Sequence, residues 1–380
     1  ETMLNKTISK VQTDKKAKQK TRQWWNSYWK RSYVFIDSGK IGSDYWKVGR
    51  NYQLFRYMLG CNAYGSEPTK FNGGLFTFDP VHIDSTRVFT PDFRLWGGGT
   101  MTAQNQRLVY FPMLKSGDFD MMKPQFDFYE RMLDNAKLRT KVYWNHGGAC
   151  FSEQIENFGL PNLAEYDWKP RHEGFPVGVD SNPWLEYTWD TALEFALMMF
   201  DAHLYNNEPI VPHLPFIESL LTFFDEHYSY LALRRGTNKL DGDGHLVLYP
   251  GSACETYKMA TNATSTVAAL KVITEKLLEL PELYATQREH WSGFLKRIPP
   301  ISYREVQGKK TISPAKMWER INNSEVPSLY PVYPWRIYGI GQPELQTAIN
   351  TYLYDPEAIE FRSHIGWKQD NIFAACLGLT

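Results

Sequence analysis

The chain has 380 residues, of which 43% are hydrophobic, so it can bury a substantial core in one large domain or in two to three smaller ones. Its 42 basic and 42 acidic residues cancel, so no overall charge attracts nucleic acid or an anionic membrane, and we expect neither as a partner. The four cysteines include no C-x-x-C pair, and no apolar run is long enough to span a bilayer; we therefore expect no metal, no cofactor and no membrane span.

The first 20 residues are polar and basic, and they predict a linker or the exposed start of a helix that continues through "QWWNSYWKRS". Within that segment Trp24, Trp25, Tyr28 and Trp29 follow helical spacing, which predicts one aromatic face packed on the core. Residues 21–380 are expected to form the catalytic-type domain.

Helical periodicity dominates the rest of the sequence. It predicts helices over about 44–63, 103–114, 122–142, 184–206, 212–233, 263–280, 281–296, 342–354 and 368–379. Strand signals are brief, namely "YVFID" at 33–37 and "HLVLYP" at 245–250. We therefore expect an all-α fold, with helices in the closed double ring of an (α/α)6 toroid.

Three long loops, at 64–102, 144–183 and 234–262, are expected to lie at one rim of this ring and to carry function. The sequence stops inside the apolar helical pattern "WKQDNIFAACLGLT", so we expect the toroid to be incomplete at its C-terminal end. The aromatic content of 15% exceeds what a core needs, and aromatic rings stack well on the apolar faces of sugars. A cleft for a polar ligand is therefore expected.

The first loop contains "KFNGGLFTFD" and "RLWGGGTMTAQNQRLVYFP". Its glycines permit close backbone approach, which places Asn72, Trp96 and Asn105 within reach of a ligand. The run "WGGGT" lacks the Lys-Ser/Thr ending of a phosphate loop, so we do not expect a nucleotide there.

Two carboxylates lie in the other loops. Glu153 follows a Gly-Gly turn, and Glu255, in "YPGSACETYKMAT", lies among small and aromatic neighbours. Two such carboxyls with an amide that holds water would suit hydrolysis of a glycosidic bond. The residues alone leave simpler interpretations open: Glu255 as a first-turn helix residue, Glu153 as a turn cap and Asn105 as a helix N-terminal residue. Similarly, "DGDGH" at 241–245 predicts a tight turn rather than a calcium loop.

Five stretches occur in the order of motifs of glycoside hydrolase family 95, the inverting α-L-fucosidases and relatives. They are "FNGGLF", "RLWGGGTMTAQNQRLVYFP", "LVLYPGSACE", "SEVPSLYPVYP" and "SHIGWKQDNIFAACLG". From about residue 20 onward the chain resembles this family, and more closely its uncharacterised bacterial six-hairpin members. The resemblance implies the (α/α)6 fold and an inverting hydrolysis.

The resemblance also implies residue roles. The family's water-positioning Asn-x-Asn pair falls on Ala103 and Asn105, so the first member is absent here. Its general acid falls on Glu255, whereas two histidines of a sugar-contacting motif are replaced by Glu325 and Ser328. The family's catalytic Asp lies in a motif that would follow Thr380.

We therefore predict a secreted or periplasmic glycoside hydrolase that acts on an oligo- or polysaccharide with inversion. Glu255 is the predicted general acid and Asn105 orients the water. The residues predicted to line the sugar subsite are Asn72, Trp96, Glu153, Trp189 and Glu325. Two alternatives stay open: a polysaccharide lyase, for which Arg94, Arg107 and His146 are available, and a glycan-binding protein without turnover.

Overall fold

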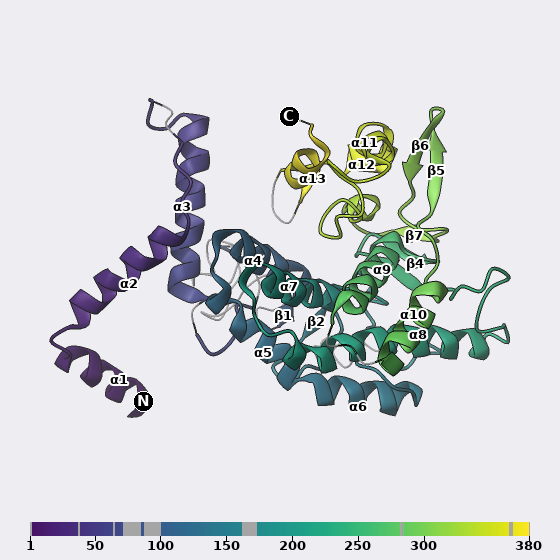
Figure 1. Cartoon of the computed structure of the whole chain (residues 1–380), viewed down its shortest axis with the longest axis horizontal. Helices are drawn as coiled ribbons and strands as arrows, with labels where there is room; N and C mark the ends of the chain where they lie inside the picture. Colours follow the sequence, from purple (N-terminus) through teal and green to yellow (C-terminus); the bar gives the residue numbers. More distant parts are fainter. Residues whose placement is uncertain are drawn as a thin grey trace.

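The computed structural model describes most of the chain (Figure 1). The described residues are 2–36, 39–63, 65–70, 85–86, 100–161, 173–281, 283, 285–364 and 368–379. The predicted ligand-binding residues Asn72 and Trp96 lie outside these ranges.

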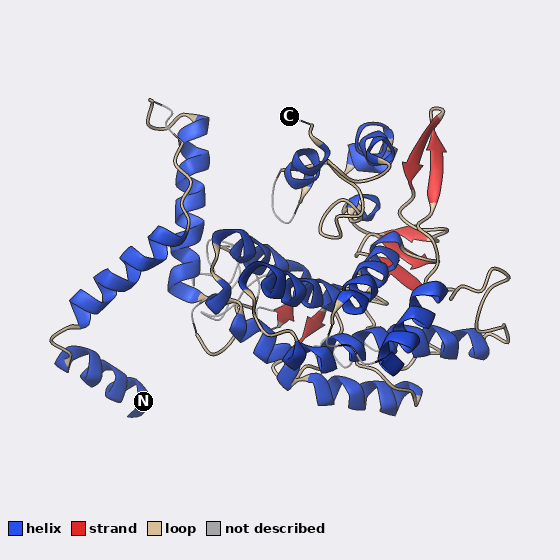
Figure 2. Cartoon of the chain, in the orientation of Figure 1, coloured by secondary structure: helices blue, strands red, loops and turns tan. Residues whose placement is uncertain are grey.

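Helices account for most of the described residues (Figure 2). They are α1 Thr2–Thr13, α2 Ala17–Arg31, α3 Asp44–Asn62, α4 Ala103–Ser116, α5 Lys123–Arg131, α6 Leu133–Trp144, α7 Thr191–Asn206, α8 Leu214–Arg234, α9 Thr264–Glu279, α10 Ala285–Arg297, α11 Leu345–Tyr354, α12 Pro356–Glu360 and α13 Asp370–Leu377. The predicted all-α class is confirmed. No helix in the described part of the chain is both long and apolar enough to cross a membrane.

The strands are short and antiparallel. Two pair as β1 Met101–Thr102 with β2 Gln154–Ile155. A three-stranded sheet has the order β3-β4-β7, and a separate hairpin joins β5 to β6. Their bounds are β3 Gly251–Ala253, β4 Tyr257–Ala260, β5 Tyr303–Val306, β6 Lys309–Ile312 and β7 Arg320–Ile321. These ribbons connect helices and, as described below, they bring distant loops together.

The helices form two layers. In α7 every residue from Ala192 to Ala202 is buried, and α4 and α9 are also buried over most of their length. A helix that is apolar on all sides needs neighbours on all sides. These inner helices pack in series, α4 on α7 and α7 on α9, while α8 packs on α7 and α10 on α9 from outside. The alternation of inner and outer helices is that of an (α/α) toroid, and in Figure 1 the inner helices α4, α7 and α9 lie in a row above α5, α6 and α8.

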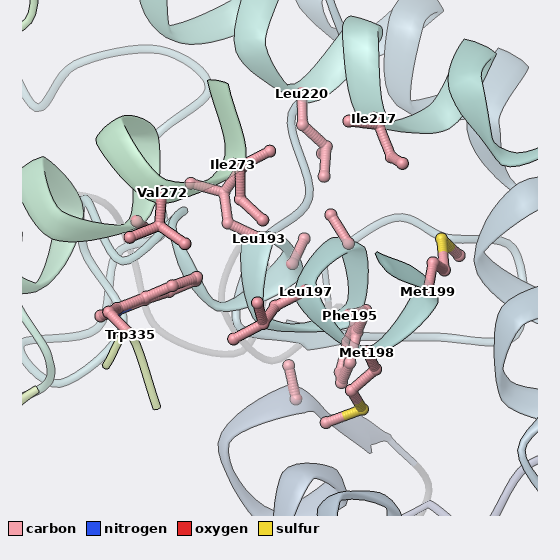
Figure 3. Packing of buried hydrophobic residues seen from close by; sticks show 14 of the residues in the cluster. Leu193, Phe195, Leu197, Met198, Met199, Ile217, Leu220, Val272, Ile273 and Trp335 are labelled. Carbon is pink, nitrogen blue, oxygen red and sulfur yellow. The ribbon is translucent and has the colours of Figure 1, made fainter. Parts of the chain in front are cut away.

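The centre of the core lies between α7, α8 and α9 (Figure 3). There Leu193 of α7 lies beside Ile273 of α9, and Leu197 of α7 and Leu220 of α8 belong to the same buried cluster. All four side chains are at most 1% exposed, so the inner helices are fixed by close apolar packing. Because the inner helices are held rigidly, the residues in their first turns have fixed positions.

The N-terminal segment is helical and exposed. Helix α1 buries no residue and α2 buries only Tyr28, and both extend away from the core helices in Figure 1. The aromatic face of α2 packs on α3, with Trp25 stacked on Tyr57 at 5.2 Å between ring centroids. A buried ion pair between Arg56 and Asp118, 2.5 Å long, then ties α3 to the turn after α4.

Several predicted elements differ in the structure. The helix predicted over 122–142 is broken at Met132 into α5 and α6. The helix predicted over 184–206 begins only at Thr191, because the buried residues before it form a loop. The segment 33–36 forms no strand: its aromatic residues Tyr33 and Phe35 are 72% and 75% exposed, and the segment pairs with no strand among the described residues. The strand predicted at 245–250 is displaced, since β3 begins at Gly251.

Candidate functional site

The first wall of a candidate site is built where β1 meets β2. The register pairs Thr102 with Gln154, directly before α4 begins. The backbone N–H of Ala103 donates to the Glu153 carbonyl at 2.9 Å, and the Gln104 N–H donates to Glu153 Oε1 at 3.0 Å. Glu153 thus caps the first turn of α4 and fixes the position of Gln104 and Asn105.

The second wall is the tip of the β3-β4 hairpin. Residues 254–256 form the turn between these strands, and Glu255 lies in it. The interpretation of Glu255 as a helix-start residue is wrong, because the next helix, α9, begins at Thr264. Asn323 follows the neighbouring strand β7, and its side-chain amide donates to Glu255 Oε2 at 2.8 Å.

These walls enclose a cavity of about 350 Å³. Its lining consists of amide side chains, one carboxyl, one indole and a few small or apolar groups, contributed by Thr102, Gln104, Asn105, Gln154, Asn182, Trp184, Leu185, Glu255 and Asn323. Among the described residues that line it, Glu255 is the one ionisable side chain. Directional amides beside an aromatic ring suit a neutral, hydroxyl-rich ligand.

Glu255 is set up to carry a proton near neutral pH. Burial of its carboxyl, with the nearby Glu325 carboxylate, raises its pKa to about 7. Lys258, the Asn323 hydrogen bond and Arg107 act in the opposite direction. A carboxyl with such a pKa can act as a general acid, since it holds its proton at the pH of the reaction and can release it.

Glu325 lies behind Glu255 rather than in the cavity wall. Its Oε2 accepts the Glu255 backbone N–H at 3.1 Å, and its Oε1 accepts from Arg107 at 3.2 Å. Arg107 also donates to Glu194 Oε1 at 2.8 Å, and all three side chains are buried. Glu325 therefore holds the backbone that carries Glu255, and it is absent from the described cavity lining, where the sequence had predicted it.

Lys258, like Arg107, is a buried cation that lowers the pKa of Glu255. Its ammonium donates to the Trp184 carbonyl at 2.5 Å, the Thr188 hydroxyl at 3.0 Å and the Ser252 hydroxyl at 2.6 Å. Burial lowers the pKa of Lys258 to about 8. The lysine thereby joins the hairpin to the loop that presents Trp184 to the cavity.

Glu153 is completely buried next to the cavity and is absent from its lining. Burial and the nearby Glu255 carboxyl raise its pKa well above the ordinary value. Its Oε1 caps α4 as described, while Oε2 has no hydrogen-bond partner among the described residues. The turn-cap interpretation left open by the sequence thus describes its contacts.

The structure brings Trp189 to a different place from the cavity. Its indole packs against Trp144, Phe223 and His227, with ring centroids 4.8 to 5.6 Å apart. Trp189 is 2% exposed and belongs to the hydrophobic core. The aromatic residue in the cavity is Trp184, which is 49% exposed and which sequence reasoning missed.

The same aromatic cluster contains a pair of histidines that predicts a pH dependence of stability. His227 is 1% exposed and lies 2.9 Å from His146, ring nitrogen to ring nitrogen. Burial, His146 and Arg139 lower the pKa of His227 well below its ordinary value. The unfolded chain takes up a proton near pH 6.5 that the folded chain does not, so stability falls as pH decreases below 6.5.

We expect His227→Gln to make the free energy of unfolding less dependent on pH. The slope should decrease by up to about 1.4 kcal/mol per pH unit, which corresponds to the uptake of one proton on unfolding. Urea unfolding between pH 7.5 and 5 measures it as the slope of the free energy of unfolding against pH. His364→Gln, at an exposed position, is the control. Equal slopes for wild type and His227→Gln would contradict the prediction.

The "DGDGH" segment forms the predicted tight turn. Asp241 Oδ1 accepts the backbone N–H groups of Asp243 and His245 at 3.0 and 2.9 Å. The side chains of these three residues offer ligand atoms within 4.8 Å of one another. The hydrogen bonds to the backbone account for this clustering.

Sequence reasoning located two residues of the cavity, Glu255 and Asn105, and missed the other polar ones. Gln104 carried a usable signal, since "TAQNQ" puts several amides in the first turn of a helix whose following residues are mostly apolar. Asn323 lies two residues before Glu325, directly before the motif already singled out. Asn182 and Gln154 carried no local signal, because they reach the cavity only through tertiary packing.

Comparison with solved structures finds a low similarity to "Putative kojibiose phosphorylase from human microbiome". The two share 16% sequence identity with a TM-score of 0.45, over 80% of this chain and 41% of that one. This chain thus spans less than half the length of that protein. No protein-family model and no curated protein matches the sequence. The resemblance to glycoside hydrolase family 95 stays a prediction.

Proposed function

We propose that this protein processes glycosides and that Glu255 is its general acid. The observation that carries the proposal is a carboxyl with a pKa of about 7 in the wall of a cavity otherwise lined mainly by amides and Trp184. The indole offers a surface for the apolar face of a sugar, while the amides pair with hydroxyl groups in both directions.

The proposed chemistry is hydrolysis with inversion. Protonated Glu255 gives its proton to the glycosidic oxygen while the bond from that oxygen to the anomeric carbon breaks. A water oriented by the Asn105 side chain attacks the anomeric carbon from the opposite face, and the configuration inverts. Glu255 is left as a carboxylate that the Asn323 amide stabilises. Asn105 cannot accept a proton, so the proton that the attacking water loses passes to a carboxylate beyond the described cavity lining or to solvent water, which balances the step.

A second candidate is glycan binding without turnover. The observation in its favour is that Glu255 is the one ionisable group in the described cavity lining, whereas an inverting hydrolase also needs a base. The lyase alternative has less support, because the described lining contains no Tyr, His, Arg or Lys for abstraction of a proton or for pairing with a uronate. A secreted or periplasmic location stays a prediction.

The pH dependence of turnover tests the proposed function. Because the acid form of Glu255 is the reactive one, kcat/KM for glycoside cleavage should be retained below about pH 7 and should fall tenfold per pH unit well above it. Release of reducing ends from malto-, cello-, xylo- and manno-oligosaccharides measures the rate. A rate that stays constant up to pH 9 would contradict the assignment of Glu255.

The same reactions separate the alternatives. Ultraviolet absorbance of an unsaturated uronate, from a uronate-containing polymer, would indicate a lyase. Calorimetric binding of an oligosaccharide without any release of reducing ends would indicate the binding function.

A further inference from the structure

A second cavity, of about 550 Å³, lies beside the β4-β7 ribbon. One side comes from the loop after α8, with Arg235 and Asn238, and the other from Tyr249 and the segment Met317 to Glu319. Its volume is within the range of small-ligand sites. The residues that form it are distinct from those that line the Glu255 cavity.

The polar groups of this second cavity hold one another in place. The Tyr249 hydroxyl donates to Glu319 Oε1 at 3.2 Å, and the Arg235 guanidinium lies 5.4 Å from the centre of the Tyr249 ring. Arg235 also donates to the Tyr249 carbonyl at 2.5 Å. One cation and one anion face the same space, so their charges balance and a ligand without net charge is favoured.

The apolar contribution comes from Trp318 and its neighbours. Trp318 packs edge-on against Tyr257, with ring centroids 5.2 Å apart and planes at 77°. Met317 beside it is 66% exposed. A fixed indole next to a carboxylate, a guanidinium and an amide is the combination that binds a sugar ring by stacking and by hydroxyl hydrogen bonds.

The two cavities lie along one ribbon. Glu255 is at the hairpin tip, and Met259, which lines the second cavity, is four residues further along. Four residues span at most ~14 Å between Cα atoms. The loop that carries Trp184 is fixed to the same ribbon, because Asn322 donates to the Pro183 carbonyl at 2.5 Å and Arg320 pairs with Glu186.

We propose that the second cavity is a distal subsite that binds the remote sugars of a neutral oligosaccharide, one end of which occupies the Glu255 cavity. This inference rests on the proposed glycoside-processing function and narrows its substrate to neutral chains longer than a disaccharide. Binding energy gained at the distal subsite then holds the chain in register for Glu255.

The test compares chain lengths. Affinities of malto-, cello-, xylo- and manno-oligosaccharides with two to five sugars are measured by calorimetry on the Glu255→Gln protein, which binds without cleavage. Trp318→Ala in that background should weaken the tetrasaccharide at least fivefold more than the disaccharide. Tyr249→Phe, which keeps the ring and removes the hydroxyl, should give a smaller loss in the same direction. Tyr45→Ala, an exposed aromatic on α3, is the control.

The outcomes are separable from those for the proposed function. A loss at Trp318 that is equal for all chain lengths, or affinities that do not rise beyond the disaccharide, would overturn the distal subsite. Glycoside turnover that survives Glu255→Gln would instead overturn the proposed function. If Trp318→Ala does not fold, Glu319→Gln and Tyr249→Phe carry the same comparison.

Discussion

Replacing Glu255 with Gln is expected to lower turnover of a natural glycoside by about 10²- to 10⁴-fold, the usual contribution of a general acid. Gln has the same shape and can accept the Asn323 hydrogen bond at 2.8 Å, so the cavity keeps its form. It has no proton to give to the leaving oxygen. The rate of reducing-end release, measured at pH 6 where the wild-type carboxyl is protonated, gives the loss directly.

The leaving group provides an internal control for this prediction. A dinitrophenyl glycoside departs as a stable anion and needs little protonation, so Glu255→Gln should slow its cleavage far less than that of an oligosaccharide. Glu305→Gln, on the exposed side of β5, should change neither rate. Equal losses on both substrates would point to a structural effect and would contradict the assignment of Glu255 as the acid.

The second large effect is expected at Arg107. Arg107→Met leaves Glu194 and Glu325 buried without their cation, which should reduce the free energy of unfolding by about 3–5 kcal/mol. Glu325 Oε2 accepts the Glu255 backbone N–H at 3.1 Å. If Glu325 moves when Arg107 is removed, the position of the Glu255 carboxyl should therefore change as well. Arg107 lowers the pKa of Glu255, so its removal should extend activity to higher pH in the protein that folds.

Denaturant unfolding of Arg107→Met is best compared with Arg297→Met. Arg297 pairs with one partner, Asp225, and its side chain is 29% exposed, so its loss should cost on the order of 1 kcal/mol or less. A similar loss of unfolding free energy for the two substitutions would contradict the prediction that the buried ion pairs of Arg107 with Glu194 and Glu325 contribute more than a partly exposed pair.

The helices could be predicted because their apolar periodicity is local. The prediction for residues 263–280 matches α9 to within a residue at each end, and that for 212–233 matches α8 to within two residues. Periodicity failed at 184–190, where Leu185, Tyr187 and Trp189 are buried in a loop. These buried residues directly precede the apolar run of α7, so the predicted helix was extended over the loop that delivers Trp184.

Glu255 could be predicted as a site residue, although its setting could not. Its pKa is raised by burial and then by Glu325, and its carboxyl is hydrogen-bonded by Asn323; both residues lie about 70 residues away. No local pattern encodes such a pairing. Trp189 was predicted in the cleft and lies in the core. A Trp residue suits either place, and only the tertiary packing determines which one it occupies.

The cavity is a junction of segments that are remote in sequence, from Thr102 near α4 to Asn323 after β7. Each segment places its side chain correctly only when the others are packed against it. The entropic cost of closing such long loops is offset only by the contacts that then form. Catalytic activity therefore requires that all of these segments are folded together. As denaturant is added, loss of activity should coincide with loss of the tertiary signal of the core, without an intermediate that stays active after part of the ring has opened.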